Sequence, residues 1–444
     1  MNIILPKPAP IILKRLYENG FEGYIVGGCV RDYLMGENPK DIDITTNAVP
    51  QDILRVFAGE KVIETGIKHG TVTVVLDSTP IEITTYRVES DYTDYRHPDH
   101  VQFCSSLKDD LCRRDFTMNA LAYNEAEGIV DYCGGIEDIN NKIIRAVGNP
   151  EERFNEDALR ILRAARFASV LGFEIEHETA EAMKRSRGLL KNISVERLSA
   201  ELIKLLCGKD VRRIMLSYTD ILSEVIPELT DIEGFDQHNP YHIYDILTHT
   251  AVTVENMPDT GYLRLAALLH DIGKPKTYTM DEKGIGHFYG HSKTSVELAK
   301  KIMMHLKLDR FTQERVCTLV RLHDTPIQAN KRSIKKWLFK ITPEVFFDLL
   351  LLKRADILAK NPSYLFRLET IDEIKRLTEE ILKEQECFSL KDLKISGDDL
   401  KEMGFEEGPL IGKTLDRLLK MVINDEIKND FEKLKIQAIK INKK

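Results

Sequence analysis

Two acids, Asp41 and Asp43, lie two residues apart in the stretch Asp-Ile-Asp. In an extended strand residues i and i+2 point to one side, so the two carboxylates would lie side by side and repel each other. A divalent cation between them relieves that repulsion, and Mg²⁺ prefers oxygen ligands while it also binds substrate phosphates. Glu82, which alternates with two isoleucines in another β-like run, is a candidate third acid. A solvated edge strand would explain the pair alone equally well.

The pair Gly27-Gly28 precedes these acids, between the β-like run 24–26 and a predicted helix that begins at 30–34. Two glycines at a strand-to-helix turn let backbone N–H groups approach a triphosphate, and the helix N-terminus adds positive potential. Arg31 would then supply a fixed cationic fork for phosphate oxygens. A plain structural turn would explain the glycines alone, but the glycines and the acids together predict nucleotidyl transfer.

Four charged residues follow one another at intervals of three: Asp157, Arg160, Arg163 and Arg166. In a helix this spacing places all four along one face. Three arginines on one stripe repel one another, and a bound triphosphate or base edge would relieve that repulsion. The alternative is a solvated stripe with one local Asp–Arg pair, a contact that contributes about 0.2–0.5 kcal/mol.

Histidines and acids recur later in the chain in an order typical of a metal site: His249, His270, Asp271 and Asp356, with His291 and His323 extending it. Imidazole and carboxylate ligands together suit Mn²⁺, Ni²⁺, Fe²⁺ or Zn²⁺ better than Mg²⁺. The set resembles the metal-binding residues of HD-domain phosphohydrolases, which implies phosphatase or 2′,3′-cyclic phosphodiesterase chemistry on RNA ends. Satisfied core histidines, or a structural relic of such a site, are the alternatives.

Two kinds of structure must position these residues. β-Branched runs predict a small mixed α/β part at the start of the chain, at 23–26, 62–63, 71–76 and 81–85, with a hairpin turn at 77–80. Later segments carry apolar residues at helical spacing, as in 158–171, 195–206 and 263–269. The predicted fold class is therefore α+β, a small α/β head followed by an all-helical remainder.

Composition excludes several classes of protein. The 444 residues are 43% hydrophobic and 30% charged, as in ordinary globular chains, and no apolar stretch predicts a membrane span. The formal net charge of −8 gives no overall attraction for a polyanion, so any nucleic-acid surface must be a local basic patch. The 7 cysteines include no Cys-x-x-Cys pair, which fits a reducing compartment and predicts a cytoplasmic location without a membrane partner.

The motifs that precede residue 170 resemble, in their order, those of the class II tRNA nucleotidyltransferases. That family comprises the CCA-adding enzymes and their poly(A) polymerase relatives in the polymerase-β superfamily. The motifs are GGCVRD (27–32), DID (41–43), RRDFTMNAL (113–121), DYCGGIED (131–138) and EDALRILRAARF (156–167). The resemblance implies four parts: a nucleotidyltransferase head (1–145), a helical neck with a base-reading helix (146–210), a helical body with the HD set (211–370), and a tRNA-binding body and tail (371–444).

The resemblance also implies roles for particular residues. Catalysis would rest on two Mg²⁺ ions and the acids Asp41, Asp43 and Glu82. The triphosphate would contact Gly28 and Arg31, and the rest of the nucleotide would contact Arg114, Asp115, Arg163 and Arg166, with Asp115 at the ribose. The incoming base would be read by Asp157 and Arg160.

Hydrogen-bond chemistry agrees with base reading by Asp157 and Arg160. A carboxylate only accepts hydrogen bonds, and a guanidinium only donates them. Cytosine and adenine each present an amine beside a ring-nitrogen acceptor, which matches this pair, whereas guanine and uracil reverse the pattern. Each unpaired buried polar contact costs about 1–3 kcal/mol, so G and U would be excluded.

The implied activity is addition of CCA to the 3′ end of tRNA from CTP and ATP, with pyrophosphate as the leaving group. Residues 86–103 resemble the flexible loop of full CCA-adding enzymes, and basic residues at 331–337 and 413–444 are candidate tRNA contacts. The first alternative is addition of A alone, by a tRNA nucleotidyltransferase or a poly(A) polymerase. An alternative of another class is a metal-dependent RNA-end phosphohydrolase that uses the head only to dock RNA. The intact acids disfavour a non-catalytic RNA-binding protein.

Overall fold

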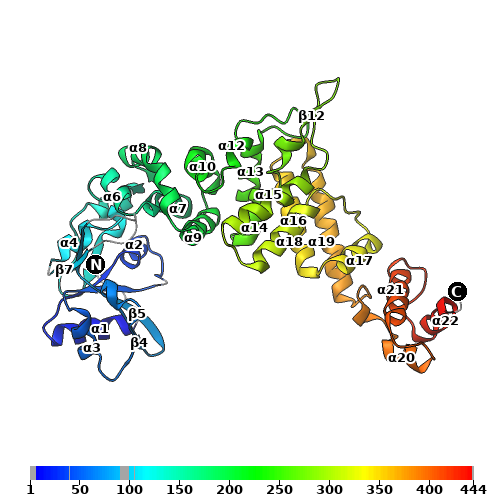
Figure 1. Cartoon of the computed structure of the whole chain (residues 1–444), viewed down its shortest axis with the longest axis horizontal. Coiled ribbons are helices and arrows are strands. Elements are labelled where there is room, and N and C mark those ends of the chain that lie inside the picture. The colour runs from blue at the N-terminus through cyan, green and yellow to red at the C-terminus, as the bar shows by residue number, and fades with distance from the viewer. Residues whose placement is uncertain (1–6, 40, 91–99, 105, 443–444) are drawn as a thin grey trace. The chain divides into compact units, whose positions relative to one another are not determined.

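The computed structural model describes residues 7–39, 41–90, 100–104 and 106–442. The chain forms two compact units, Met1–Thr230 and Asp231–Lys444 (Figure 1). The predicted head and neck both fall in the first unit, and so do residues 211–230, which the sequence assigned to the body. No helix of the described residues is long and apolar enough to cross a bilayer.

A seven-stranded sheet in the order β3-β4-β5-β2-β1-β8-β9 forms the centre of the head. Its strands are β1 (Gly23–Val26), β2 (Asp43–Thr46), β3 (Lys61–Ile63), β4 (Thr71–Leu76), β5 (Thr79–Thr85), β8 (Leu121–Asn124) and β9 (Gly128–Asp131). Val26, the last residue of β1, faces Asp43, the first residue of β2. Asp43 is also in register with Glu82 on the parallel strand β5. The register therefore places two predicted acids together beside the turn that follows β1.

The turn between β4 and β5 is shorter than predicted. It consists of Asp77 and Ser78, whose φ angles of 49° and 63° suit the tight turn of a two-residue hairpin. Thr79 and Pro80, predicted as turn residues, pair with the end of β4 instead. Every second side chain of β4 is buried, as the alternation in its sequence requires.

Helices complete the first unit. Helix α2 begins directly after Gly27, two residues before the predicted start. The helices are α1 (Pro8–Glu18), α2 (Gly28–Leu34), α3 (Pro50–Val56), α4 (Leu107–Cys112), α5 (Gly135–Asn141), α6 (Pro150–Glu156), α7 (Leu159–Leu171), α8 (His177–Ser186), α9 (Val195–Leu206), α10 (Val211–Ser217), α11 (Thr219–Leu222) and α12 (Leu229–Ile232), the last of which reaches into the second unit. Asp157 ends α6 in an extended conformation and thereby separates α6 from α7.

Two short ladders lie beside the main sheet in the first unit. One pairs β10 (Ile143–Ile144) with β11 (Glu174–Ile175) in parallel. The other pairs β6 (Arg87–Ser90) with β7 (His100–Phe103). The predicted flexible loop 86–103 therefore carries a two-stranded ladder at its ends, and its centre, 91–99, lies outside the described residues.

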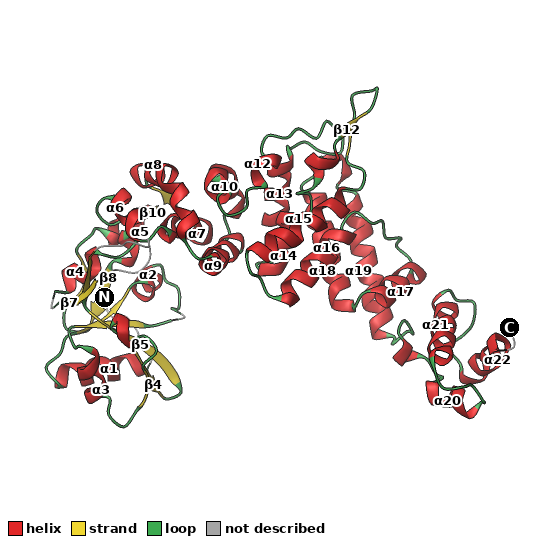
Figure 2. Cartoon of the chain, viewed as in Figure 1, coloured by secondary structure: helices red, strands yellow, loops and turns green. Residues whose placement is uncertain are grey.

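The second unit is built from helices, apart from the short hairpin of β12 (Thr279–Met280) and β13 (Gly286–His287) (Figure 2). Its helices are α13 (Ile246–Glu255), α14 (Gly261–Leu269), α15 (His291–His305), α16 (Arg310–Leu322), α17 (Lys331–Lys340), α18 (Pro343–Leu358), α19 (Arg367–Lys383), α20 (Gly397–Glu402), α21 (Pro409–Ile423) and α22 (Phe431–Asn442). Contacts among α13, α14, α16 and α18 form its centre. The α20–α22 segment has a core of its own around Leu400, Leu418 and Leu434. The predicted α+β class, with a small sheet in the head, is confirmed.

Candidate active site and metal centre

A cavity of about 820 Å³ in the first unit brings together every residue predicted for nucleotide binding and catalysis except Glu82. Its lining includes Gly28, Arg31, Asp41, Asp43, Arg114, Asp115, Asp157, Arg160, Arg163 and Arg166. These residues come from β2, α2, α7, the segment after α4 and the α6–α7 junction. The cavity therefore joins the head to the predicted neck.

The acids of the cavity carry negative charge that the nearby Arg114 offsets only in part. Asp41, Asp43 and Glu82 have no ion-pair partner among the described residues. The Asp43 carboxylate opens to the cavity, yet surrounding protein atoms reduce its hydration, and this effect followed by the Glu82 charge raises its pKa. Acids that destabilise one another in this way fit a cation.

Two details of the acid cluster differ from the predicted arrangement. The β2 strand begins at Asp43, so Asp41 precedes the strand and does not share its pleat. Glu82 lines a neighbouring, smaller cavity together with Asp43. Among the described residues, no third histidine, cysteine or acid lies close enough to complete a compact three-ligand group with Asp41 and Asp43.

The glycine turn lies against Arg114. Gly27 has φ of +71°, a conformation that favours glycine, and a Cβ atom at this position would lie 3.1 Å from an Arg114 guanidinium nitrogen. Arg31 is 8% exposed and donates to Asn119 Oδ1 at 2.7 Å and to Asp32 Oδ1 at 2.6 Å. The predicted triphosphate cation is therefore held in a fixed orientation at the edge of the cavity.

Asp115 is held from both sides. Its Oδ2 accepts hydrogen bonds from Arg163 at 2.6 and 2.9 Å, and its Oδ1 accepts one from Asn119 at 3.0 Å. Burial opposes ionisation, but Arg163 and Asn119 outweigh it and lower the pKa to about 2. Asp115 is therefore an ionised acceptor at neutral pH. Arg114 donates to Asp110 at 3.3 Å, while its buried Nε has no partner among the described atoms.

The predicted base-reading pair does not lie on one helix. Asp157 lies at the break between α6 and α7, where its carboxylate accepts hydrogen bonds from Arg197 at 2.8 and 3.3 Å. Arg160 lies on α7 and donates to Glu156 at 2.7 Å and to the Arg113 carbonyl at 3.0 Å. Both groups line the cavity, so one fixed acceptor and one fixed donor face the same space.

Acids separate the arginines that the sequence predicted to repel one another. Glu201 on α9 accepts a hydrogen bond from Arg166 at 2.8 Å and lies 3.8 Å from Arg163. The Arg166 guanidinium also lies 3.6 Å from the centre of the Phe167 ring. Arg197 and Glu201 were not predicted as site residues, although both lie in the predicted helix 195–206. A buried acid beside apolar residues is the signal that could have identified Glu201.

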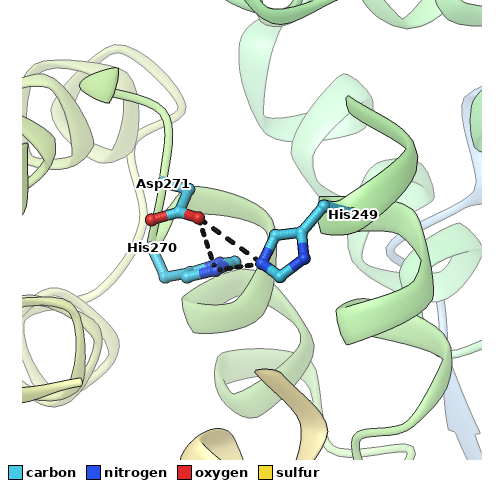
Figure 3. A group of neighbouring side chains, drawn as sticks. All are labelled: His249, His270 and Asp271. Atoms are coloured by element: carbon cyan, nitrogen blue, oxygen red, sulfur yellow. Dashed lines mark hydrogen bonds and ion pairs between the residues drawn. The ribbon is translucent and has the colours of Figure 1, made fainter. Parts of the chain in front are cut away.

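The second unit gathers the predicted histidine–aspartate set. His249 comes from α13, and His270 and Asp271 lie just past the end of α14 (Figure 3). The Nε2 atoms of His249 and His270 lie 3.4 Å apart, and they lie 3.5 and 3.1 Å from Asp271 Oδ2. Asp356 on α18 approaches His249 Nε2 at 3.1 Å.

His291 and His323 form a second half of the set around the other oxygen of Asp271. Their Nε2 atoms lie 3.2 Å apart and 3.3 and 3.5 Å from Asp271 Oδ1. This buried oxygen has no hydrogen-bond partner among the described atoms. Asp271 therefore faces two clusters of nitrogen ligands, one on each carboxylate oxygen.

Backbone carbonyl groups fix the tautomer of all four imidazoles. Each Nδ1 lies within hydrogen-bond distance of a carbonyl oxygen, those of Ala359, Ala267, Phe288 and Val320 for His249, His270, His291 and His323. When Nδ1 carries the proton, Nε2 presents a lone pair. Paired Nε2 lone pairs at 3.2 and 3.4 Å repel each other, and a metal ion between them removes that repulsion. The residues therefore fit a transition-metal centre.

Two lysines at this centre were missed in the sequence analysis. Lys274 Nζ lies 2.6 Å from Asp271 Oδ2, and Lys360 Nζ lies 2.6 Å from Asp356 Oδ2. Both lysines line a cavity of about 300 Å³ that also contains His291. The spacings of three and four residues from the two aspartates are the signal that could have identified them.

Two lysines of the predicted basic patch at 331–337 are neutralised by acids. Lys331 pairs with three glutamates, Glu380, Glu384 and Glu386. Lys335 pairs with Glu386 and Asp425 at 3.3 Å each. Their charges stabilise contacts within the second unit and are less available to a polyanion.

Comparisons with known proteins agree with this geometry. Three family models match: "Poly A polymerase head domain" over residues 23–145, "Probable RNA and SrmB- binding site of polymerase A" over 172–233, and "tRNA nucleotidyltransferase domain 2 putative" over 279–437. Together with the acid-lined cavity, they define a nucleotidyltransferase.

The relatives define the family more closely. The chain is 34% identical to the CCA-adding enzyme of Pediococcus pentosaceus over 95% of this chain and 94% of that protein. It is 51% identical to that of Lactobacillus helveticus, but over 49% of this chain and 54% of that protein, so this match spans about half of each. The crystal structure of the Bacillus stearothermophilus CCA-adding enzyme in complex with CTP is similar with a TM-score of 0.74 and 29% identity, and covers 99% of this chain and 98% of that one. The chain belongs to the family of CCA-adding enzymes.

Proposed function

We propose that this protein adds CCA to the 3′ end of tRNA from CTP and ATP without a nucleic-acid template. The observation that carries the proposal is the single cavity that unites Asp41 and Asp43 with the fixed donor–acceptor pair Arg160 and Asp157. Family membership adds the substrate class, and a match to a CTP complex supports the nucleotide. A cytoplasmic location is part of the proposal, since the described cysteines are free thiols.

In the proposed reaction the 3′-hydroxyl of the RNA attacks the α-phosphate of the NTP, and pyrophosphate leaves. Asp41 and Asp43, with Glu82 adjacent, would hold Mg²⁺, which when bound stabilises the charge of the entering and leaving oxygens. Arg31, fixed by Asn119, binds the triphosphate. The acid and basic groups position the substrates and form no covalent intermediate with them.

The choice of base follows from the hydrogen-bond acceptor and the hydrogen-bond donor that line the cavity. The Asp157 carboxylate accepts the exocyclic amine of cytosine or adenine, and Arg160 donates to the ring nitrogen beside that amine. Guanine and uracil place an oxygen against the carboxylate and an N–H against the guanidinium. Asp115, kept ionised by Arg163, accepts a hydrogen bond from the ribose.

The decisive experiment supplies tRNA that lacks its CCA end with labelled CTP and ATP, singly and together. We expect two C residues with CTP alone and the full CCA with both nucleotides. Asp41→Ala/Asp43→Ala should abolish addition, while the exposed-acid control Glu64→Ala keeps it. Addition of A alone to every substrate would instead show an A-adding enzyme or a poly(A) polymerase. Full activity of the double variant would refute the role of Asp41 and Asp43 in nucleotidyl transfer.

A second function rests on the second unit: we propose a metal-dependent phosphohydrolase that acts on phosphate groups of RNA ends. Its metal ligands would be His249, His270, Asp271 and Asp356, with His291 and His323 around the other oxygen of Asp271. The supporting observation is the set of four imidazoles whose Nδ1 atoms are tied to carbonyl groups. Neutral nitrogen and carboxylate ligands favour Mn²⁺ or Ni²⁺ over Mg²⁺.

Metal content and hydrolysis of 2′,3′-cyclic phosphates test this second function. Wild-type protein should bind Mn²⁺ or Ni²⁺, gain thermal stability from it and hydrolyse 2′,3′-cyclic AMP. Asp271→Asn should lose all three properties, whereas Glu314→Gln, at an exposed acid on α16, should keep them. Equal hydrolysis by Asp271→Asn and wild type would remove the hydrolase function.

A further inference from the structure

An aromatic strip lies on the surface of the second unit, formed by Tyr241, Tyr364, Phe366 and Arg367. The rings of Tyr241 and Tyr364 lie 4.6 Å apart between centres, and those of Tyr364 and Phe366 lie 6.4 Å apart. The Arg367 guanidinium carbon lies 5.5 Å from the Tyr241 ring centre and 5.3 Å from that of Tyr364. Tyr241 is 41% exposed and Phe366 63% exposed, so large apolar faces meet solvent here.

Backbone contacts hold the two segments of the strip together. Asn361 donates its backbone N–H to the Tyr241 carbonyl at 3.0 Å and its side-chain amide to the Pro240 carbonyl at 3.3 Å. The same side chain accepts the Ser363 N–H at 3.0 Å and thereby caps the short turn before Tyr364. The strip is therefore a preformed surface rather than two independent loops.

Both segments of the strip lead directly into the histidine–aspartate centre. His242, next to Tyr241, packs its ring 4.9 Å from that of His249. Lys360, next to Asn361, pairs with Asp356 and lines the cavity at the centre together with Asn239. A chain that lies on the strip would therefore have its end within reach of the metal ligands.

The chemistry of the strip suits bases joined by phosphates. Aromatic rings in sequence stack on successive unpaired bases without selecting their identity. Arg367 has no ion-pair partner among the described residues, so its charge is available to a phosphate or a base face. Lys274 and Lys360 also line the cavity, where each is paired with an aspartate and offsets its negative charge. A protein partner would match the rings alone and would leave the charge of Arg367 unexplained.

We propose that the aromatic strip binds the bases of a single-stranded RNA 3′ end and directs its terminal phosphate to the histidine–aspartate centre. This inference rests on the proposed hydrolase function of that centre, and it specifies the substrate as an oligonucleotide end rather than a free mononucleotide. In this proposal, contacts with the aromatic strip, and not with the metal ligands, make the protein prefer an oligonucleotide end over a mononucleotide.

The test compares hydrolysis of a short single-stranded RNA that ends in a 2′,3′-cyclic phosphate with hydrolysis of 2′,3′-cyclic AMP, both with Mn²⁺. For Phe366→Ala and Arg367→Gln we expect kcat/KM on the RNA to fall about 5- to 150-fold, the range that corresponds to about 1–3 kcal/mol for one aromatic–base stack. The rate on the mononucleotide should stay within about twofold, because it does not reach the strip. The matched control is Phe311→Ala, a ring 61% exposed on the same unit with Arg315 over it.

A binding measurement separates failure of the strip from failure of the hydrolase. Fluorescence anisotropy of the labelled RNA with Asp271→Asn protein needs no catalysis. Tight binding by Asp271→Asn, weakened by an added Phe366→Ala but not by an added Phe311→Ala, supports the strip even where no hydrolysis occurs. Equal RNA binding with and without Phe366, or equal losses on RNA and mononucleotide, would overturn the proposal.

Discussion

Asp157 and Arg160 are each held in place by another side chain of the protein before any base binds. Arg197 orients the carboxylate, and Glu156 orients the guanidinium. A selecting group must be fixed before the substrate arrives, because a mobile acceptor could turn toward a wrong base. If Asp157 and Arg160 read the base as proposed, selectivity should therefore depend on side chains that do not contact the nucleotide.

Arg197→Ala should loosen the choice between nucleotides. We expect discrimination against UTP and GTP to fall about 5- to 100-fold, the range that corresponds to one lost buried polar contact, while metal-dependent CTP addition continues. The measurement is kcat/KM for each of the four NTPs on tRNA that lacks CCA. Arg213→Ala is the matched control, since Arg213 is similarly exposed and pairs with Glu174 and Asp210 away from the cavity. Unchanged discrimination in Arg197→Ala would contradict its positioning role.

Asp115 should stabilise the fold in a pH-dependent way. Its pKa is lowered to about 2 from 3.8, so its ionised form stabilises the folded state above about pH 4, and this contribution is lost as the pH falls toward 2. We expect Asp115→Asn to lower the free energy of unfolding by about 2 kcal/mol at pH 7 and by about half as much at pH 3. Urea unfolding at several pH values measures this, with the exposed Asp220→Asn as control. A difference that does not change with pH would point to lost hydrogen bonds instead of charge.

At the scale of elements, the bounds of a strand or helix are predicted best where one side of that element is buried. The strands Gly23–Val26 and Thr71–Leu76 and the helix Val195–Leu206 have the predicted bounds, because alternation or helical spacing of apolar residues alone specifies them. The helix predicted from Ala158 begins one residue later, and Asp157 lies outside it. The Asp157 side chain accepts the backbone N–H of Leu159 at 3.1 Å, a local contact typical of the start of a helix. Its extended conformation accompanies the contact with Arg197, forty residues farther along the chain.

The turn between β1 and α2 provides a test at this scale. Gly27→Ala places a Cβ atom 3.1 Å from the Arg114 guanidinium, whereas Gly20→Ala, at a similar φ of +82°, meets nothing within 4 Å. Both variants should lose about 1–3 kcal/mol of stability from backbone strain. Only Gly27→Ala should also reduce kcat/KM for CTP addition, by about tenfold or more, because it displaces a nucleotide-site cation. Equal activity of the two variants would show that the space beside Gly27 is not needed for catalysis.

At the scale of the molecule, each unit carries a complete candidate site. The acid-lined cavity lies in Met1–Thr230, and the histidine–aspartate centre lies in Asp231–Lys444. Sequence motifs singled out most of the residues that the structure brings together at the two sites, and the roles of those residues stay predictions. Lys274 and Lys360 left a local signal in their spacing from the two aspartates, but the aromatic strip could not be predicted, because its residues meet only when distant segments fold together.

Reciprocal variants should therefore separate the two activities. Asp41→Ala/Asp43→Ala should abolish CCA addition and leave Mn²⁺-dependent phosphate hydrolysis within about twofold of wild type, and Asp271→Asn should do the reverse. Both reactions are measured on the full chain at equal protein concentration. Loss of both activities in either variant would mean that one site depends on the other.

The helix α9 has a consequence for how such enzymes change their nucleotide preference. It supplies Arg197 to Asp157 and Glu201 to Arg163 and Arg166, so one short amphipathic segment contacts three of the charged groups that are proposed to bind the nucleotide. Substitutions there can retune what is incorporated while the strand carrying Asp43 stays untouched. A chimera that exchanges residues 146–210 between relatives of different preference should thus inherit its choice of nucleotide from the donor of that segment, and its turnover from the donor of the sheet.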